Sequence, residues 1–178
     1  MISKKILSYL EKNKIFHEIV SHKKVFTARD LAATLKEKTN KIAKTLLVKV
    51  GGKKYILVIV PANLKLDFNK IKKALKIDKA ELATEKAIAK VLKLKPGTVL
   101  PFGSLYKLEI LIDKALLKTE KVLVGAGTFT ESLRLKVKDL VNVEKATVAD
   151  IGAILKVQAI KTIKKIKSAS KKLKKGKS

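Results

Sequence analysis

The chain has 178 residues, with 42 Lys or Arg against 15 Asp or Glu, and a formal net charge of +27. The absence of cysteine excludes disulfides, thiolate metal sites and a cysteine nucleophile, and two histidines five residues apart argue against a metal centre or a Ser-His-Asp triad. A hydrophobic share of 47% can build a core, while no apolar run has membrane-spanning length and the N-terminus lacks a signal-peptide pattern. These features predict a cytoplasmic protein with a polyanionic partner.

The first third of the chain predicts helices and strands in alternation. In chain order, these are a helix over 2–13, a strand over 15–20, a helix over 28–37, and strands over 41–50 and 53–60. Thr27 is the expected N-cap of the second helix. Gly51 and Gly52 separate the last two strands, whose β-branched runs therefore predict a hairpin with a tight turn.

The remainder of the body continues the alternation after Pro61. The predicted elements are helices over 68–75 and 85–93, a loop over 96–103, strands over 108–112, 121–124 and 133–137, and a helical turn over 138–141. Asp67 and Thr84 are the expected N-caps of the two helices. The simplest assembly is an α/β fold of the α+β type, in which helices surround a mixed, largely antiparallel sheet.

The positive charge is concentrated at the C-terminus, since residues 156–178 contain ten lysines and no acidic residue. Apolar positions from Ile151 to Ile166 share one helical face, which predicts a basic amphipathic helix ending in a lysine-rich tail. The helix either docks on the core or binds RNA or an anionic membrane surface. The tail either tethers RNA, which we favour, or serves only as a solubilising end. The chain thus divides into a domain over 1–155 and an extension over 156–178. The expected RNA-tethering residues are Lys171, Lys172, Lys174, Lys175 and Lys177.

Lys44 is the most unusual residue of the predicted hairpin. It has the parity of Ile42 and Leu46, so a regular strand would place it on their apolar face. A lysine on a buried face needs a partner or a function. The alternative is a position at the edge of the sheet, where the stem of the side chain would reach outward to water.

Two glycine loops, the histidines and one carboxylate are further candidates. Residues 125–128 follow a β-rich run and can present N–H groups to an oxyanion or a phosphate, although most such loops are simple turns. Residues 97–103 are likewise either a site loop or a connection. His22 can act as a base or ligand, or be an ordinary surface residue. Asp113 follows a strand-like run and either orients a polar network or caps the next turn.

Several short motifs occur in an order that is specific when they are taken together. They are Ile-Ala-Lys-Thr-Leu-Leu-Val at 42–48, Tyr-Ile-Leu-Val-Ile-Val-Pro at 55–61, Leu-Asp at 66–67, Pro-Gly-Thr-Val-Leu-Pro-Phe-Gly at 96–103, Ile-Asp at 112–113, Gly-Ala-Gly-Thr at 125–128 and Asp-Leu at 139–140. In this order they resemble the YbaK/ProX aminoacyl-tRNA deacylase family, which is similar to the editing insertion domain of bacterial prolyl-tRNA synthetase. The resemblance spans about residues 15–152.

The resemblance implies roles for individual residues. Lys44 matches the family's functional lysine and is the expected catalytic residue. The expected substrate-binding residues are Thr45, Gly97, Pro101, Phe102, Gly103, Gly125, Ala126, Gly127 and Thr128, with His22 and Asp113 as additional candidates. Phe129 follows the glycine loop where many relatives have His.

The resemblance also implies a hydrolase that deacylates mischarged aminoacyl-tRNA in trans, by ester hydrolysis at the 3′ end. Lys44 is expected to bind either the terminal phosphate or the developing oxyanion while water attacks. The expected partner is aminoacyl-tRNA, and an aminoacyl-tRNA synthetase is a second candidate. We expect a monomer that needs no cofactor or metal and does not bind membranes. The alternatives are a noncatalytic RNA-binding module and a synthetase-associated protein that delivers tRNA without cleaving it.

Overall fold

Short helices and strands alternate through the computed structural model, which describes residues 1–155, 164, 165 and 167. The helices are α1 (Lys4–Lys12), α2 (Ala28–Leu35), α3 (Phe68–Leu75), α4 (Glu85–Leu92) and α5 (Val137–Glu144), with 3-10 turns η1 (Thr39–Lys41), η2 (Gly103–Tyr106) and η3 (Lys114–Lys118). The strands are β1 (His17–Ser21), β2 (Ala43–Val50), β3 (Lys54–Pro61), β4 (Leu64–Leu66), β5 (Ala80–Leu82), β6 (Ile110–Asp113), β7 (Lys121–Gly125), β8 (Glu131–Lys136), β9 (Thr147–Ala149) and β10 (Gly152–Ile154). In this part of the chain, no helix has the length and apolar character needed to span a membrane.

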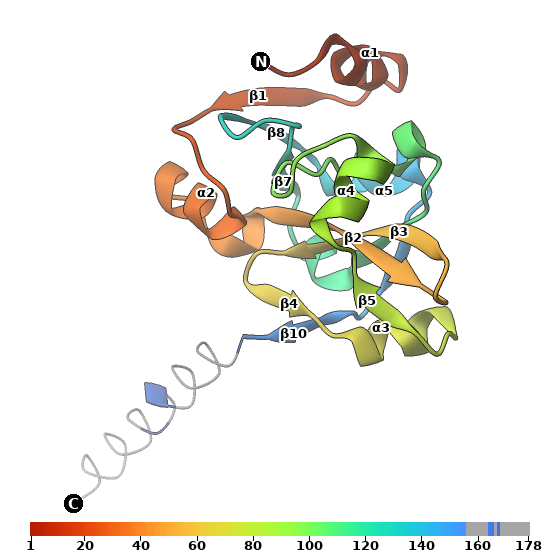
Figure 1. Cartoon of the computed structure of the whole chain (residues 1–178). Coiled ribbons are helices and arrows are strands. Elements are labelled where there is room, and N and C mark those ends of the chain that lie inside the picture. Colours follow the sequence, from red (N-terminus) through yellow and green to blue (C-terminus); the bar gives the residue numbers. More distant parts are fainter. Residues whose placement is uncertain (156–163, 166, 168–178) are drawn as a thin grey trace, which may run out of the picture.

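The strands form three sheets, with a five-stranded sheet at the centre (Figure 1). Its order is β5-β2-β3-β6-β9, in which β2 is antiparallel to both neighbours whereas β3, β6 and β9 are parallel. An antiparallel sheet, β1-β8-β7, lies above it in the view of Figure 1, and β10 pairs with β4 below. The predicted α+β fold with a mixed, largely antiparallel sheet and surrounding helices is therefore confirmed.

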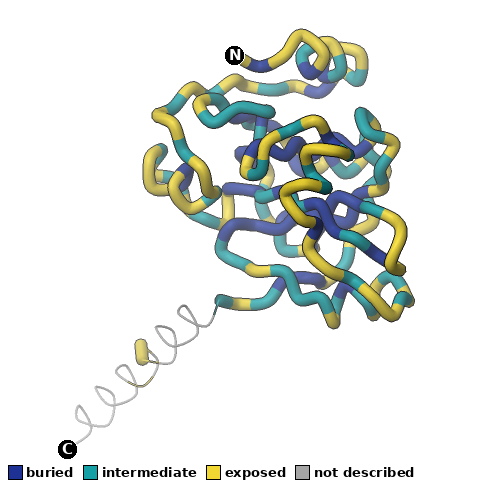
Figure 2. Tube along the Cα trace, in the orientation of Figure 1, coloured by how far each residue is buried: buried dark blue, intermediate teal, exposed yellow. Residues whose placement is uncertain are grey.

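Both faces of the inner strands β3 and β6 are buried, as the dark strands at the middle of Figure 2 show. On β3, Leu57 and Ile59 face a cluster shared with β7, β8, α1 and α5, whereas Val58 faces α3 and the segment before β10. Each fully buried aliphatic side chain of this size stabilises the fold by roughly 1.5–3 kcal/mol. The central strands are thus a rigid support for β2, which lies beside β3.

The predicted helix starts and the predicted hairpin are formed by local contacts. Thr27 and Thr84 each accept a hydrogen bond from the N–H three residues later, at 3.1 and 3.2 Å, and Asp67 caps α3 in the same way. At the end of β2, Gly51 and Gly52 have φ of +59° and +78°, a conformation that glycine adopts without strain. These contacts lie within a few residues of one another, so local patterns were sufficient to predict them.

The C-terminal prediction needs a correction, because the expected helical face does not begin at Ile151. Ile151 is fully buried, and the next three residues form β10, antiparallel to β4. The Lys70 ammonium stabilises this strand by donating hydrogen bonds of 2.8 Å to the Asp150 carboxylate and to the Gly152 carbonyl. Lys164, Lys165 and Lys167 are helical. The expected tethering residues Lys171, Lys172, Lys174, Lys175 and Lys177 lie outside the described residues, and the boundary at 155 stays a prediction.

Candidate active site at the open edge of strand β2

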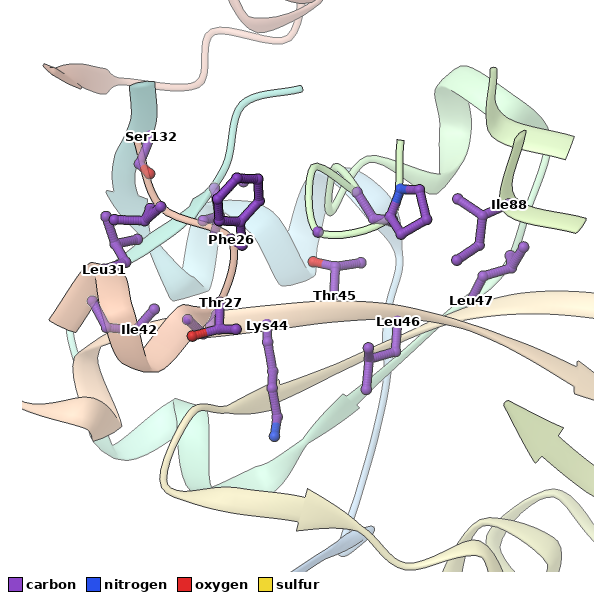
Figure 3. Close-up of a pocket in the computed structure, with 18 of the residues that line it drawn as sticks. Phe26, Thr27, Leu31, Ile42, Lys44, Thr45, Leu46, Leu47, Ile88 and Ser132 are labelled. Atoms are coloured by element: carbon purple, nitrogen blue, oxygen red, sulfur yellow. The ribbon is translucent and has the colours of Figure 1, made fainter. Parts of the chain in front are cut away.

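A cavity of about 380 Å³ opens beside the first half of β2. Its walls come from the segment before α2, the start of α4, the loop before Val99 and the ends of β7 and β8 (Figure 3). Most of the wall is apolar and includes Phe26, Leu31, Ile42, Leu47, Ile88 and Val99. Such a cavity, with few polar groups, is the usual form of a small-molecule site.

The cavity lies where one edge of β2 has no partner strand. β2 pairs with β3 along its whole length, but with β5 only at its last three residues. On the β5 side, the Leu47 carbonyl accepts a bond from the Ala83 N–H at 2.9 Å. Backbone groups alternate along a strand, so the N–H and C=O of Thr45 face the same edge. No strand among the described residues pairs with β2 at Thr45, and its backbone groups are therefore available to a ligand.

Thr45 also has a hydroxyl without a partner on the cavity side of β2. The residue is only 8% exposed, and its buried Oγ1 makes no hydrogen bond within the described part of the chain. Figure 3 shows the side chain on the same side of the strand as Phe26. A buried polar group without a partner costs about 1–3 kcal/mol, so native proteins retain few of them. This unpaired hydroxyl is the strongest local sign of a ligand site.

Lys44 leaves the opposite face of β2, so its ammonium points away from Thr45 (Figure 3). Lys44 is nevertheless one of the residues that line the cavity, and its side chain is half-buried. Burial, and then the positive charge of Arg29, lower the pKa of Lys44 below 10.5. Neither cation has an ion pair among the described residues. A partly desolvated ammonium without a carboxylate partner can stabilise an anion.

His22 lines the cavity together with Ser132, which sequence reasoning missed. His22 Nδ1 lies 2.8 Å from the carbonyl of Lys23, so this nitrogen donates. His22 Nε2 lies 2.9 Å from the hydroxyl oxygen of the buried Ser132, and in the neutral form of the ring it accepts a hydrogen bond from that hydroxyl. Both ring nitrogens are thus occupied, and His22 holds Ser132 in place. The two residues are 110 positions apart, so no local pattern indicates this pair.

Both glycine loops reach the cavity, through Gly97 and Gly125. A Cβ on Gly97, which has φ of +84°, would lie 2.9 Å from the carbonyl oxygen of Phe26. A Cβ on Gly125 would lie 2.6 Å from the carbonyl oxygen of Val99. Thr128 also lines the cavity, and its hydroxyl accepts the N–H of Glu131 at 3.0 Å. Glycine is therefore required at both positions because neighbouring backbone approaches closely.

Other predicted site residues are not brought to the cavity. They are Pro101, Phe102, Gly103, Ala126, Gly127 and Asp113. Phe102 and Ala126 are fully buried in the core, where the ring of Phe102 lies 5.3 Å from that of Tyr9. Pro101 and Gly103 are also buried, whereas Gly127 is half-buried and lines a different groove, so only part of each motif faces the cavity.

Asp113 has a structural role, which was one of its two predicted alternatives. It is 1% exposed, and its carboxylate accepts bonds from the N–H groups of Ala115, Ile151 and Gly152 at 2.8, 2.9 and 2.7 Å. We expect Asp113→Ala to lower the free energy of unfolding by about 2–4 kcal/mol, because three buried N–H groups lose a charged acceptor. Urea denaturation measures this loss. An unchanged unfolding midpoint, or lost turnover in protein that is still folded, would contradict the structural role.

An open strand edge with a nearby ammonium and a free hydroxyl can bind an ester and stabilise the oxyanion formed when the ester is hydrolysed. The fold and site have the features needed by a hydrolase for activated esters. A family model described as the aminoacyl-tRNA editing domain matches residues 22–143. The chain belongs to this family, which confirms the resemblance found in the sequence and the predicted class of aminoacyl-tRNA deacylase.

Individual relatives agree with the family assignment. The chain is 27% identical over 146 residues to the prolyl-tRNA editing protein ProX of Acetoanaerobium sticklandii, covering 79% of this chain and 89% of that protein. It is 29% identical over 103 residues to the proline–tRNA ligase of Staphylococcus saprophyticus. That match covers 58% of this chain and 18% of the ligase. A crystal structure described as a proposed trans-editing enzyme for prolyl-tRNA synthetase has a TM-score of 0.75 at 24% identity, covering 86% of this chain and 99% of that one.

Proposed function

We propose that the protein acts in trans to remove a wrongly attached amino acid from the 3′ end of tRNA, with the cavity beside β2 as the ester site. The observation that supports this most is the unpaired, buried hydroxyl of Thr45 beside an unpaired strand edge. An aminoacyl ester offers a carbonyl, an ammonium and ribose hydroxyls that could satisfy these groups.

In the proposed mechanism, the ester lies across the open edge of β2. Water attacks the carbonyl carbon, helped by a neighbouring ribose hydroxyl, and the bond to the ribose oxygen then breaks. The proton that the attacking water loses passes to the leaving ribose oxygen, and the free amino acid departs. Lys44 stabilises the oxyanion from one face of the strand. The N–H of Thr45 orients the ester from the strand edge, and the hydroxyl of Thr45 does so from the other face. No covalent enzyme intermediate is needed, because the ester is already activated.

The proposed substrate is tRNA for proline that bears an amino acid other than proline. One relative is named as a prolyl-tRNA editing protein, and this chain covers 89% of it, while other relatives are named as proline–tRNA ligases. An editing site of this kind selects by size, because side chains smaller than the cognate one can enter and the cognate one is excluded. The apolar cavity walls favour small uncharged side chains. The synthetase that makes the error is the implied partner, and we propose that the protein acts as a monomer in the cytoplasm.

The test is to incubate the purified protein with tRNA for proline charged with glycine, alanine, serine, cysteine or proline, and to follow the loss of the ester. We expect at least one small residue to be hydrolysed about tenfold or more faster than proline, the range of discrimination that size allows. If none of the esters is cleaved while tRNA still binds, the protein is instead a noncatalytic tRNA-binding module.

The lysine-rich tail is a separate part of the proposal. We propose that Lys171, Lys172, Lys174, Lys175 and Lys177 hold tRNA by its backbone charge. Deleting residues 168–178 should weaken binding and flatten its salt dependence, by roughly 0.9 in slope for each duplex phosphate that the tail neutralises. Titration of labelled tRNA at two salt concentrations measures both effects. Equal affinity of the full and shortened chains at both concentrations would rule out tethering.

A further inference from the structure

We infer that a second groove, next to the ester cavity, holds the phosphates of the unpaired nucleotides that precede the terminal adenosine. This inference rests on the proposed function. The groove has a volume of about 560 Å³, and its lining includes Lys24, Lys93, Lys95, Thr128, Phe129 and Thr130. It differs from the cavity in character, because three lysines line it where apolar side chains line the cavity.

The groove and the cavity are built by the same three loops. Lys24 lines the groove, and the residues directly after it line the cavity. Lys93 and Lys95 line the groove, and the next two residues line the cavity. The loop after β7 also contributes to both spaces, and its Thr128 lines the cavity as well as the groove. The two spaces are therefore neighbours, and nucleotides that precede an adenosine bound in the cavity would lie close to the groove.

An aromatic pair lies between the two spaces. The rings of Phe26 and Phe129 have centroids 5.1 Å apart, and Lys24 Nζ lies 5.2 Å from the centre of the Phe26 ring. Gly97 packs against both residues, since a Cβ there would lie 2.9 Å from the Phe26 carbonyl and 3.5 Å from the Phe129 ring. Phe26 is 59% exposed. An exposed ring beside a cation suits unpaired nucleotides, whose bases can stack on the ring while their phosphates contact the lysines.

The charge of the groove is not neutralised by the protein. No acidic residue lines it, and none of its three lysines has an ion pair among the described residues. A groove beside β5 is different, because Asp78 and Glu81 lie there with Lys49, Lys72 and Lys79. Of these two grooves, the first therefore presents uncompensated positive charge to a ligand. Its position beside the cavity favours the nucleotides next to the terminal adenosine over a distant duplex region.

The experiment compares a groove variant (Lys24→Gln, Lys93→Gln and Lys95→Gln) with a matched control (Lys49→Gln, Lys72→Gln and Lys79→Gln). Each is assayed on the mischarged tRNA and on the same amino acid esterified to adenosine, which has no phosphate. We expect the groove variant to lose about tenfold or more in kcat/KM on the tRNA, with the salt slope lower by about 2, since each single-strand phosphate neutralised contributes about 0.7. Its rate on the adenosine ester should be unchanged, and the control should match the wild type on both substrates.

Equal rates of the groove variant and the wild type on tRNA would overturn the inference. A parallel loss on the adenosine ester would also overturn it, because the lysines would then act on the ester or on folding. The variant with arginine at the same three positions keeps the charge and should retain the tRNA rate. If the wild type cleaves neither substrate, the proposed function fails. The groove is then tested by binding of the trinucleotide CCA, which the wild type should bind and the glutamine variant should not.

Discussion

Replacing Lys44 with methionine is expected to lower kcat/KM for the mischarged tRNA by about 10²–10³-fold, the usual cost of losing one oxyanion-stabilising group. Methionine keeps an unbranched, apolar stem beside the cavity and removes only the charge. The ammonium is half-buried and has no ion pair within the described part of the chain, so a developing negative charge would interact with it strongly. Single-turnover hydrolysis of the charged tRNA measures the effect. Lys49→Met, in the same strand but at the groove beside β5, is the matched control.

The lowered pKa of Lys44 adds a pH dependence with a definite sign. Its pKa in the folded protein lies below 10.5, because burial and the charge of Arg29 disfavour the ammonium. At pH values between the pKa of Lys44 in the folded protein and its ordinary value of 10.5, the unfolded chain binds more protons than the folded one. The contribution of Lys44 to the free energy of unfolding therefore rises with pH across that window. Turnover that needs the ammonium should fall across the same window. In Lys44→Met, both dependences should disappear and the protein should be more stable at neutral pH. Normal turnover by the folded variant would exclude a catalytic role for Lys44.

Replacing Thr45 with valine is expected to change stability and activity in opposite directions. Valine has the same shape and removes a buried hydroxyl that makes no hydrogen bond to the described residues. The free energy of unfolding should therefore rise by about 1 kcal/mol, since an unsatisfied buried group costs about 1–3 kcal/mol. The kcat/KM for the mischarged tRNA should fall by about tenfold, the value of one hydrogen bond to the bound ester. Urea denaturation and single-turnover hydrolysis measure the two effects.

The matched control for this variant is Thr128→Val. Thr128 also lines the cavity, but its hydroxyl already accepts the N–H of Glu131. The same substitution should therefore lower stability at this position, because an N–H loses its acceptor. A loss of stability in Thr45→Val would show that its hydroxyl is satisfied in the free protein. Unchanged hydrolysis would show that the hydroxyl does not contact the ester.

Sequence reasoning predicted best those features that depend on near neighbours. The caps at Thr27, Asp67 and Thr84 and the hairpin around Gly51 each depend on residues within a few positions. It missed β4, β5, β9 and β10, because each has three residues and too short a pattern to detect. These strands form through pairing with distant segments, which a local pattern does not contain.

The candidate site also contains some residues that could be predicted from the sequence and others that could not. The motif around Lys44 and the two glycine loops could be found from the sequence, and each contributes at least one residue to the cavity. Ser132, the partner of His22, could not be found from the sequence, because the pairing of strands that are distant in the chain brings the two residues together. The inward positions of Phe102 and Ala126 also depend on the packing of the whole core.

The sequence by itself determined the kind of protein: an α+β domain with a strongly basic surface, a lysine within a β-hairpin and motifs of an editing family. Only the tertiary structure decided how that lysine can act. β5 pairs with the end of β2 and leaves the edge at Thr45 open. Alternation along the strand then places Lys44 and Thr45 on opposite faces of that edge. The physical reason is that strand pairing and register depend on contacts between segments far apart in the chain.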